Sequence, residues 1–264
     1  MDLELGDKTV LVTGSTGGLG HAAAKLFARE GATVIVSGRT QARVDAARAA
    51  IEAEVPRARV RGVTADVGTA AGVATLVAQE PTVDVLVNNV GVYAPRSFEE
   101  ISDAEWMRYF ETNVMSGIRL SRHYLAGMLA KNWGRIIFIS SESAIQVPAE
   151  MIDYGMTKAA QLAVSRGLAE RARGTGITVN CILPGPTRSE GLDAFVRGRA
   201  RDRGVPEADA EKDFFATARP SSLIGRFETP DEVANLIVYT ASQRASGTTG
   251  SALRVDGGMV RSII

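Results

Sequence analysis

The sequence predicts an α/β fold, in which a doubly wound parallel sheet of about seven strands carries helices on both faces. Three observations predict it. Short apolar segments alternate with longer segments of helical period along the whole chain, which is the pattern of βαβ units. The apolar segments are continuous rather than alternating in polarity, as in strands that are covered on both faces. A glycine cluster joins the first apolar segment to the first helical one, so a tight turn is expected there.

The expected strands are rich in β-branched residues. They span Lys8–Thr13, Ala32–Ser37, Arg59–Val63, Val83–Val87, Arg135–Ile139, Ile177–Ile182 and Ala252–Val255. The expected helices span Leu19–Glu30, Gln41–Glu54, Ala70–Gln79, Asp103–Lys131, Ile152–Arg173 and Pro230–Ala241. Gly31 is a typical end for the first helix, and Ser102 or Asp103 is expected to cap the fourth. Thr229 followed by Pro230 is a typical start for the last helix.

The chain shows no linker, repeat or low-complexity segment, so its 264 residues are expected to form one domain, 1–264. One stretch departs from the alternation. Residues Ser189–Glu228 lie between a strand and a helix and are rich in Arg, Asp, Gly and Ala. Because an insertion of this length in a compact domain is usually functional, we expect 189–228 to form a lid over a substrate site.

Composition excludes several classes of protein. Thirty basic residues balance thirty acidic ones, which argues against a protein that coats nucleic acid. No apolar run approaches the roughly 20 residues that span a bilayer, and the first residues do not resemble a secretory signal. The two histidines have no metal-ligand partners at a useful spacing, so no metal is expected. Cys181 is the single cysteine, which fits a reducing compartment and a cytoplasmic protein.

The segment Thr13–Gly20 reads Thr-Gly-Ser-Thr-Gly-Gly-Leu-Gly, between the first strand and the first helix. Glycines let a backbone turn tightly and approach a pyrophosphate, and a helix N-terminus directs amide donors at that anion. This position predicts a Rossmann-like dinucleotide site. Two spacings fit equally well. Gly14, Gly18 and Gly20 match T-G-x-x-x-G-x-G, and Gly14, Gly17 and Gly20 match T-G-x-x-G-x-x-G.

The end of the second strand predicts which dinucleotide is preferred. An acidic residue there, about 20 residues past the glycines, would accept hydrogen bonds from the ribose hydroxyls of NAD. This chain has Gly38 and then Arg39 at that place. A guanidinium can instead pair with a 2′-phosphate, so we expect NADP (NADPH) to be preferred over NAD.

Tyr154 and Lys158 open the helix after the fifth strand. Residues four apart share a helix face, and a nearby ammonium favours the phenolate, so we expect Lys158 to lower the pKa of Tyr154. A phenol so tuned can exchange a proton near neutral pH. Ser140 and Ser141 end the fifth strand, and Asn88–Gly91 ends the fourth. The carboxyl ends of parallel strands meet at one edge of the sheet, where ligands bind.

Together these residues resemble the classical short-chain dehydrogenase/reductase family, and the resemblance covers nearly the whole chain. Tyr154 and Lys158 match the family's Y-x-x-x-K, and Ser141, rather than Ser140, has the spacing of its catalytic serine. Asn113 matches its catalytic asparagine. The other matches are Asp66-Val67 with the adenine-contacting pair, Asn88-Asn89-Val90-Gly91 with N-N-A-G, and Pro184–Ser189, loosely, with P-G-x-[IV]-x-T. The chain ends soon after the seventh strand, whereas extended relatives usually carry a larger C-terminal region, so the classical glycine spacing is favoured.

The resemblance implies hydride transfer between nicotinamide C4 and a carbonyl or secondary alcohol. Tyr154 would be the acid or base, Lys158 would tune it and hold the nicotinamide ribose, Ser141 would polarise the substrate oxygen, and Asn113 would hold a relay water. The implied cofactor contacts are Gly14, Ser15, Thr16, Gly18, Leu19, Gly20, Arg39, Asp66, Val67, Asn89, Val90, Gly91, Tyr154, Lys158, Pro184, Gly185, Thr187 and Ser189.

The resemblance also implies a small-molecule substrate and a homotetramer packed through two long helices and the last strand. β-Ketoacyl thioesters, sugars or polyols, and small ketones or quinones are all candidate substrates. Two other functions stay open. The chain could be a non-catalytic NADP-sensing protein on the same fold, or an extended-type epimerase or dehydratase.

Overall fold

The computed structural model describes residues 1–263, and its centre is one parallel sheet. The strands are β1 (Thr9–Val12), β2 (Thr33–Gly38), β3 (Arg59–Thr64), β4 (Val85–Asn88), β5 (Gly134–Ile139), β6 (Ile177–Pro184) and β7 (Ala252–Val255). Their order is β3-β2-β1-β4-β5-β6-β7, and all six pairings are parallel. The chain winds outward from β1 in one direction and from β4 in the other, so the predicted doubly wound sheet is confirmed.

Helices connect the strands. They are α1 (Gly18–Arg29), α2 (Gln41–Glu54), α3 (Ala70–Gln79), α4 (Asp103–Phe110), α5 (Ser116–Lys131), α6 (Ile152–Arg171), α7 (Glu190–Arg203), α8 (Glu207–Thr217) and α9 (Pro230–Ala241). Gly31 follows α1 with a left-handed φ of 82°, as expected at this helix end. The Thr229 side chain caps α9, and Glu232 completes the capping box. Of the described helices, none has both the length and the apolar character needed to cross a membrane.

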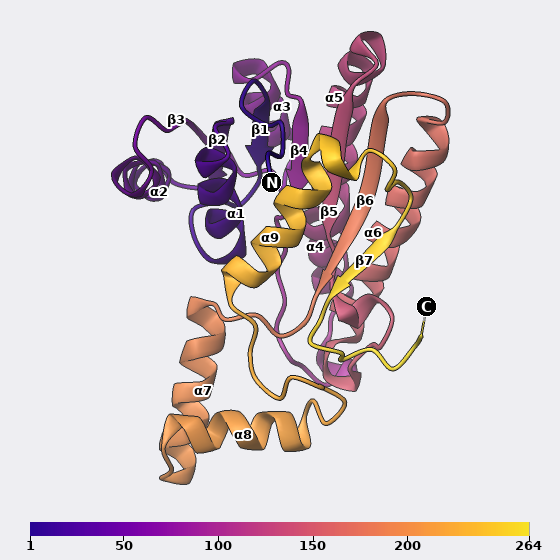
Figure 1. Ribbon diagram of the computed structural model, residues 1–264. Coiled ribbons are helices and arrows are strands. Elements are labelled where there is room, and N and C mark those ends of the chain that lie inside the picture. The colour runs from indigo at the N-terminus through magenta and orange to yellow at the C-terminus, as the bar shows by residue number, and fades with distance from the viewer. Residues whose placement is uncertain (264) are drawn as a thin grey trace.

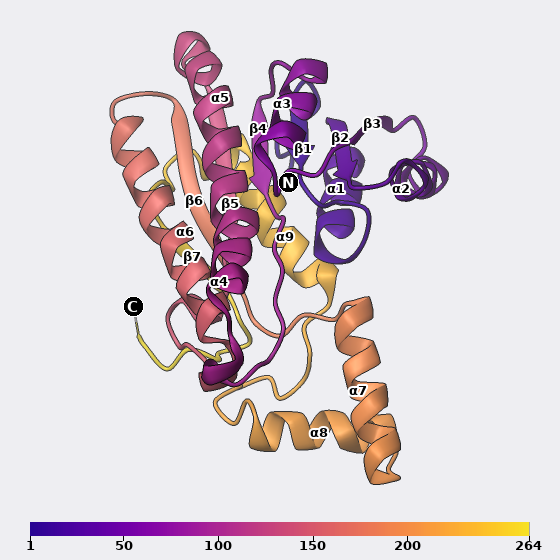
Figure 2. The same cartoon turned by 180° about the vertical axis from the view of Figure 1, so that it is seen from behind.

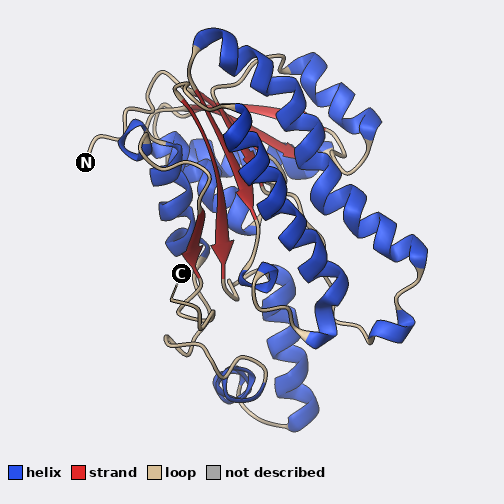
Figure 3. Ribbon diagram, turned by 90° about the vertical axis from the view of Figure 1, so that its right-hand side faces the viewer, coloured by secondary structure: helices blue, strands red, loops and turns tan. Residues whose placement is uncertain are grey.

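Two layers of helices enclose the sheet. In Figure 1, α1 and α9 lie in front of the strands, whereas Figure 2 shows α5 and α6 on the other face. Seen from the side in Figure 3, the strands lie between the two layers. One buried cluster joins strand residues such as Val12 and Val36 to α1 and α9. A second joins residues such as Leu11 and Ile136 to α3, α5 and α6. Strands buried on both faces explain the continuous apolar runs of the sequence.

The helix expected over Asp103–Lys131 is present but is not uniform. Ser102 caps α4 by accepting a hydrogen bond from Glu105 N at 3.3 Å. A π-helical turn, Glu111–Met115, then separates α4 from α5. A π turn inserts one residue into the helical register and is frequent at functional sites. It contains Asn113, which is 1% exposed, and the insertion turns this side chain toward the sheet edge described below.

Residues 189–228 contain α7 and α8, which project beyond the body of the molecule in Figure 1. The two helices have an apolar cluster of their own. It comprises Val196, Ala200, Ala210, Phe214, Phe215, Phe227 and Met259. Met259 comes from the segment after β7, so the C-terminal part of the chain reaches across to α7 and α8. This cluster is separate from the two that flank the sheet.

Candidate active site

The loop between β1 and α1 distinguishes the two glycine spacings. Gly14 and Gly18 have left-handed φ values of 62° and 53°, which side chains with a Cβ adopt only at a cost. Gly17, the N-cap of α1, has φ −178°, an extended conformation open to any residue. The loop therefore requires glycine at positions 14 and 18 but not at 17. This agrees with T-G-x-x-x-G-x-G, the spacing favoured from the length of the chain.

A network of hydrogen bonds fixes this loop to the end of β4. The Thr13 hydroxyl donates to Val87 O at 3.2 Å and accepts from the amides of Asn89 and Val90 at 2.9 and 3.2 Å. The Asn89 side chain donates to Thr13 O and Gly14 O at 2.9 and 3.2 Å. The Asn89 side chain, which was expected to contact the cofactor, therefore supports the glycine loop.

The loop fits a dinucleotide. A Cβ at Gly18 would point into open space, so the backbone can be approached closely there. Gly17 has no side chain to cap α1, which leaves the amides at the start of the helix available for a pyrophosphate. Gly20 has a packing role, because a Cβ there would lie 2.5 Å from Asn89 Nδ2 and 2.6 Å from Gly14 O.

Ser15 has no free polar group in this loop. Its hydroxyl donates to Val12 O at 2.7 Å and accepts from Ser37 N at 3.0 Å, and its own amide donates to Ser37 O. The residue is fully buried. Its hydrogen bonds hold the loop against β2, and the expected cofactor contact of Ser15 stays a prediction. Thr16 lies beside Gly38, where a Cβ would meet the Thr16 methyl at 2.4 Å.

Two arginines lie at the end of the site where an adenosine would bind. Arg39 follows β2 directly, and Arg43 lies in the first turn of α2. A Cβ at Gly17 would be 3.6 Å from an Arg43 guanidinium nitrogen, so Arg43 reaches back over the glycine loop. Within residues 1–263, neither side chain has a hydrogen bond or ion pair. The sequence analysis missed Arg43, although its spacing of four residues from Arg39 is a usable signal.

Asp66 and Val67 follow β3 at the same edge of the sheet. The Asp66 carboxylate accepts a hydrogen bond from Gly68 N at 3.0 Å and stays exposed, while Val67 is buried in the cluster beneath α3. Asp66 is therefore accessible to an adenine, whereas Val67 can offer one only its backbone.

Ser141, Tyr154 and Lys158 meet where β5 ends and α6 begins. Ser141 is 6% exposed and acts to lower the pKa of the Tyr154 phenol, while Ser140 donates to Lys158 O at 2.8 Å. Ser140 is thus used within the fold, and Ser141 is the serine that faces the site. Lys158 Nζ is buried, donates to Ile139 O at 2.7 Å and lies 5.4 Å from the centre of the Tyr154 ring.

The expected lowering of the Tyr154 pKa is wrong. Burial raises the pKa of Tyr154 above its usual range, the Glu142 charge raises it further, and a hydrogen bond from Ser141 lowers it. Burial also lowers the pKa of Lys158 to about 8. The expectation considered a nearby ammonium and left out desolvation, which is the largest cause of the shift.

Asn113 connects the segments of the site. Its side chain accepts from Val92 N at 2.8 Å and donates to Val92 O and Thr157 Oγ1, both at 3.0 Å. The backbone carbonyl oxygen of Asn113 accepts from Gln161 Nε2 at 2.5 Å, and Gln161 Oε1 accepts from Lys158 Nζ at 3.4 Å. Gln161 therefore joins Lys158 to Asn113, and the relay water expected at Asn113 stays a prediction. Gln161 was not predicted from the sequence.

Gly91 lies beside this group. A Cβ at Gly91 would be 3.3 Å from Lys158 Nζ and 3.7 Å from Asn113 Oδ1. The absence of a side chain keeps Lys158 accessible from the loop after β4. The neighbouring Val90 packs at the edge of the cluster beneath α3 and α5.

The segment after β6 is held by a buried carboxyl group. Glu228 accepts from Gly185 N at 3.2 Å and from the Thr187 hydroxyl at 3.4 Å. It is 3% exposed, and burial raises its pKa to about 7. The Ser189 hydroxyl caps α7 by accepting from Leu192 N at 3.2 Å. Glu228 was missed because its partners lie more than 40 residues away in sequence.

Glu142, directly after Ser141, is a second buried carboxyl group at the site. It is 6% exposed and starts the short 3-10 helix Glu142–Ala144. Its carboxylate accepts from the hydroxyls of Ser141 and Ser143. Burial raises the pKa of Glu142. Within residues 1–263 no group of His, Cys, Asp and Glu is arranged to hold a metal ion.

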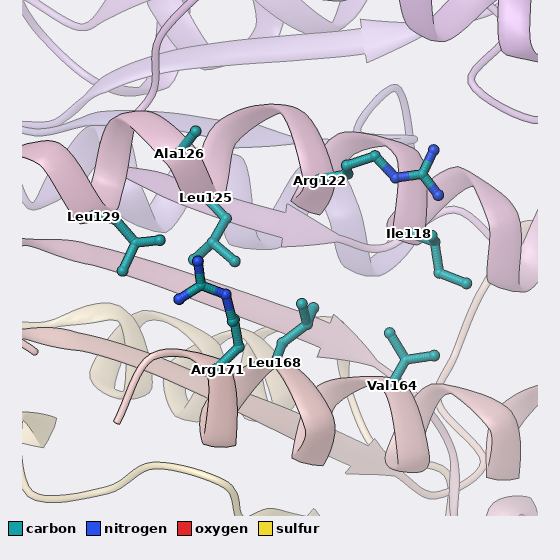
Figure 4. A pocket seen from close by; sticks show the side chains of 8 residues that line it. All are labelled: Ile118, Arg122, Leu125, Ala126, Leu129, Val164, Leu168 and Arg171. Atoms are coloured by element: carbon teal, nitrogen blue, oxygen red, sulfur yellow. The ribbon is translucent and has the colours of Figure 1, made fainter. Parts of the chain in front are cut away.

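A separate apolar groove lies between α5 and α6 on the outer face of the helical layer. It is lined by Ile118, Arg122, Leu125, Ala126, Leu129, Val164, Leu168 and Arg171. Figure 4 shows that the α5 and α6 side chains face one another across it. These residues are distinct from those of the catalytic group.

The fold and the site define a dinucleotide-dependent α/β oxidoreductase, and comparisons with known proteins give its family. Residues 8–199 match the family model described as short chain dehydrogenase. The chain is 47% identical over 266 residues to the uncharacterized oxidoreductase YvrD of Bacillus subtilis (strain 168), with 100% of both chains covered. It is 33% identical over 260 residues to D-beta-hydroxybutyrate dehydrogenase of Cupriavidus necator, covering 97% of this chain and 99% of that protein.

Among solved structures, L-sorbose reductase from Gluconobacter frateurii, complexed with NADPH and L-sorbose, is similar over 100% of both chains. The TM-score is 0.94 at 33% sequence identity. The chain therefore belongs to the short-chain dehydrogenase family. It is an NAD(P)-dependent oxidoreductase that acts on alcohol or carbonyl substrates.

Replacing Gly18 with alanine tests the glycine loop. We expect Gly18→Ala to lower the free energy of unfolding by about 1–2 kcal/mol, because alanine is disfavoured in the left-handed region. NADPH binding should weaken as well, since the new Cβ points into the open space in front of the loop. Urea denaturation and fluorescence titration with NADPH measure the two effects.

Gly17→Ala is the matched control. Gly17 has extended backbone, and its Cβ would make an ordinary contact with Arg43. This variant should match the wild type in stability and NADPH affinity. Equal loss in both variants would contradict the assigned spacing.

Proposed function

We propose that the protein is an NADP-dependent reductase or dehydrogenase that interconverts a carbonyl compound and a secondary alcohol, with Tyr154 as its acid or base. The observation that carries this proposal is the meeting of Ser141, Tyr154 and Lys158 at the end of β5. The glycine loop lies at the same edge of the sheet, after the adjacent strands. A substrate oxygen held by Ser141 and Tyr154 would be within reach of a nicotinamide bound along this edge.

When bound, the nicotinamide would donate or accept the hydride at the substrate carbon. Ser141 orients the substrate oxygen and stabilises the negative charge that grows on it during reduction. Tyr154 then gives its phenolic proton to that oxygen, and in oxidation it takes the proton back. Lys158 holds the ribose hydroxyls and stabilises the phenolate once its ammonium has turned toward Tyr154.

Lys158 and Gln161 support the return of a proton to Tyr154. Lys158 has a pKa near 8 because it is buried, so it can exchange a proton in the neutral range. Its contact with Gln161 connects it to Asn113 O, at the π turn. We propose that Asn113 holds this chain in place through its contacts with Val92 and Thr157.

The preference for NADP is supported by the two arginines near the glycine loop. Arg39 and Arg43 have no protein partners in the described part of the chain, and no carboxylate follows β2. A 2′-phosphate would give both guanidinium groups a partner. L-sorbose reductase, the structural relative at a TM-score of 0.94, is complexed with NADPH.

Two alternative functions are less well supported. A non-catalytic NADP sensor would need none of Asn113, Ser141, Tyr154 and Lys158, yet all four are present. Lys158 is joined to Asn113 through Gln161 and lies 5.4 Å from the centre of the Tyr154 ring. An extended-type epimerase or dehydratase would use the other glycine spacing, and Gly17 lacks the left-handed φ of Gly18.

We propose that residues 189–228 form a lid that selects the substrate. The segment begins directly after the loop that contains Gly185 and Thr187, and its last residue, Glu228, is hydrogen-bonded to both. A movement of α7 and α8 would therefore change the position of this loop. Sugars or polyols come first among the candidate substrates, because L-sorbose reductase is complexed with L-sorbose and matches the whole chain, α7 and α8 included.

The groove between α5 and α6 supports a homotetramer. Apolar side chains such as Ile118, Leu129 and Leu168 are only partly covered there, and a second copy of the chain would bury them. We also propose that the protein works in the cytoplasm, because Cys181 is a free, buried thiol of the kind retained in a reducing compartment.

Tyr154→Phe tests the catalytic assignment. The substitution removes the phenolic proton and keeps the ring, so turnover of a reducible carbonyl substrate should fall by about 10²–10⁴-fold. NADPH affinity should change little. Steady-state assays of NADPH oxidation against a panel of ketoses, β-ketoacyl thioesters and small ketones give the first value, and fluorescence titration gives the second.

Tyr93→Phe is the control for Tyr154→Phe. The Tyr93 ring lies 5.7 Å from that of Tyr154 and is 53% exposed. This variant should keep turnover of the wild-type order. Undiminished turnover by Tyr154→Phe would contradict the assigned role.

Arg39→Asp tests the preference between the dinucleotides. A hydrogen bond to a charged group contributes about 1.5–3 kcal/mol, so the ratio of kcat/KM for NADPH to that for NADH should fall roughly 10- to 100-fold. Arg48→Asp makes the same charge change on the exposed face of α2, and it should leave the ratio near the wild-type value. A ratio unaffected by Arg39→Asp would show that Arg39 does not contact the 2′-phosphate.

Ala126→Asp tests the homotetramer. Ala126 is exposed in the α5–α6 groove, so association would have to remove a charged carboxylate there from water. We expect the wild type to elute as a tetramer and Ala126→Asp as a smaller species in size-exclusion chromatography with light scattering. Ala49→Asp, on an exposed part of α2, should remain tetrameric. A wild-type monomer, or a tetrameric Ala126→Asp variant, would contradict the proposal.

A further inference from the structure

Glu142 places a buried carboxyl group on the catalytic serine. One carboxylate oxygen accepts from the Ser141 hydroxyl, and the other accepts from the Ser143 hydroxyl at 3.2 Å. The Ser143 amide donates to Ser141 Oγ at 3.1 Å. Ser141 therefore has contacts on both sides that are independent of any substrate.

The hydroxyl of Ser141 carries a single hydrogen, and two groups compete for it. One is the Glu142 carboxylate, and the other is the Tyr154 oxygen, next to which the substrate oxygen would bind. A serine hydroxyl donates one hydrogen bond and accepts up to two. While Glu142 is ionised, the hydrogen points at the carboxylate, and only a lone pair of Ser141 faces the substrate.

A protonated Glu142 reverses this arrangement. A carboxylic acid donates a hydrogen bond, so Ser141 Oγ would accept from both Glu142 and the Ser143 amide. Its own hydrogen would then be free to bind a carbonyl oxygen. Because a carbonyl oxygen can only accept, reduction needs Ser141 as a donor, whereas an alcohol can donate to the Ser141 lone pair.

We propose that Glu142 is a positioning residue that sets the direction of the Ser141 hydroxyl, so that its protonated form favours carbonyl reduction and its ionised form does not. This inference rests on the proposed function of the site. In this proposal the proton on Glu142 never moves to the substrate. It controls whether Ser141 can polarise the substrate oxygen.

Charged groups on the neighbouring elements bear on this proton. Arg219, after α8, favours the Glu142 carboxylate, but it is also paired with Glu150 at 3.2 Å. The Glu142 charge partly opposes the lowering of the Lys158 pKa on α6. The same attraction favours the ionised form of Glu142. Burial opposes both and is the largest influence, which raises the pKa of Glu142 overall.

The Tyr154 phenol near Glu142 adds no charge around pH 7, because its pKa is raised above the usual range. The Tyr93 ring packs beside it. A charge on Glu142 makes ionisation of Tyr154 harder.

Glu142→Gln provides the main test. The glutamine amide can donate to Ser141 and accept from Ser143, as the neutral acid does. We expect kcat for carbonyl reduction by the wild type to fall about tenfold per pH unit above the Glu142 pKa, as for any reaction that needs one protonated group. Glu142→Gln should lack this fall, with an unchanged KM for NADPH. Glu99→Gln, on the exposed 3-10 turn Phe98–Glu100, is the matched control and should keep the wild-type profile.

If kcat of Glu142→Gln falls with rising pH over the same pH range as that of the wild type, the proposal is overturned. If Glu142→Gln does not fold, as judged by thermal melting, Glu142→Ala serves in its place. Alanine leaves the Ser141 hydrogen with no carboxylate to bind, so this variant should also lack the fall in kcat.

Infrared difference spectroscopy tests the same proton without turnover. The wild type should show a protonated carboxyl band that disappears as pH rises and that is absent from Glu142→Gln. In Ser141→Ala the midpoint should move upward, because the carboxylate loses a stabilising hydrogen bond. An unchanged midpoint would overturn the coupling of Glu142 to Ser141. Lack of turnover by the wild type on every carbonyl compound would instead reject the proposed function, so the two failures are distinguishable.

Discussion

The hydrogen bonds of Asn113 are the constraint on which the candidate active site depends. This one residue contacts the loop after β4 through Val92, and it contacts α6 through Thr157 and Gln161. The bonds to α6 are buried and the one to Val92 is partly buried, and an unpaired buried amide would cost about 1–3 kcal/mol. Asn113 lies in the π turn. It provides a polar connection between the helix carrying Lys158 and the loop at Gly91 and Val92.

The sequence predicted the fold in nearly full detail because burial leaves a strong signal. Most strands are runs of apolar or β-branched residues, whereas β3 carries Arg59 and Arg61. The helix ends at Gly31 and Thr229 have local causes. The π turn left no such signal, since the extra residue changes the backbone register and not the amphipathic pattern. The helices of 189–228 bury their own small cluster rather than joining the sheet, so their boundaries could not be inferred from the βα rhythm.

The site was predicted in its membership more than in its contacts. The residue types named from the sequence lie at one sheet edge, but Asn89 and Ser15 use their side chains to brace the glycine loop. Gln161 was missed because its importance comes from partners brought close by folding. The pKa of Tyr154 moved opposite to expectation for the same reason. The spacing in the sequence indicates that the Lys158 ammonium lies near Tyr154. It cannot indicate how strongly folding desolvates the Tyr154 phenol.

The separate core of α7 and α8 has a consequence for how such a protein can diverge. Phe214, Phe215 and Phe227 pack on one another and on Met259, apart from the clusters that support the sheet. Substitutions on the outer faces of these helices therefore leave the sheet's own core unchanged, and their effects on stability should be nearly additive with changes in the sheet. Residues 189–228 can therefore vary without disturbing the core of the sheet. The segment behaves as a replaceable module, provided that a replacement preserves its attachments, among them the packing on Met259 and the hydrogen bonds of Glu228 to Gly185 and Thr187.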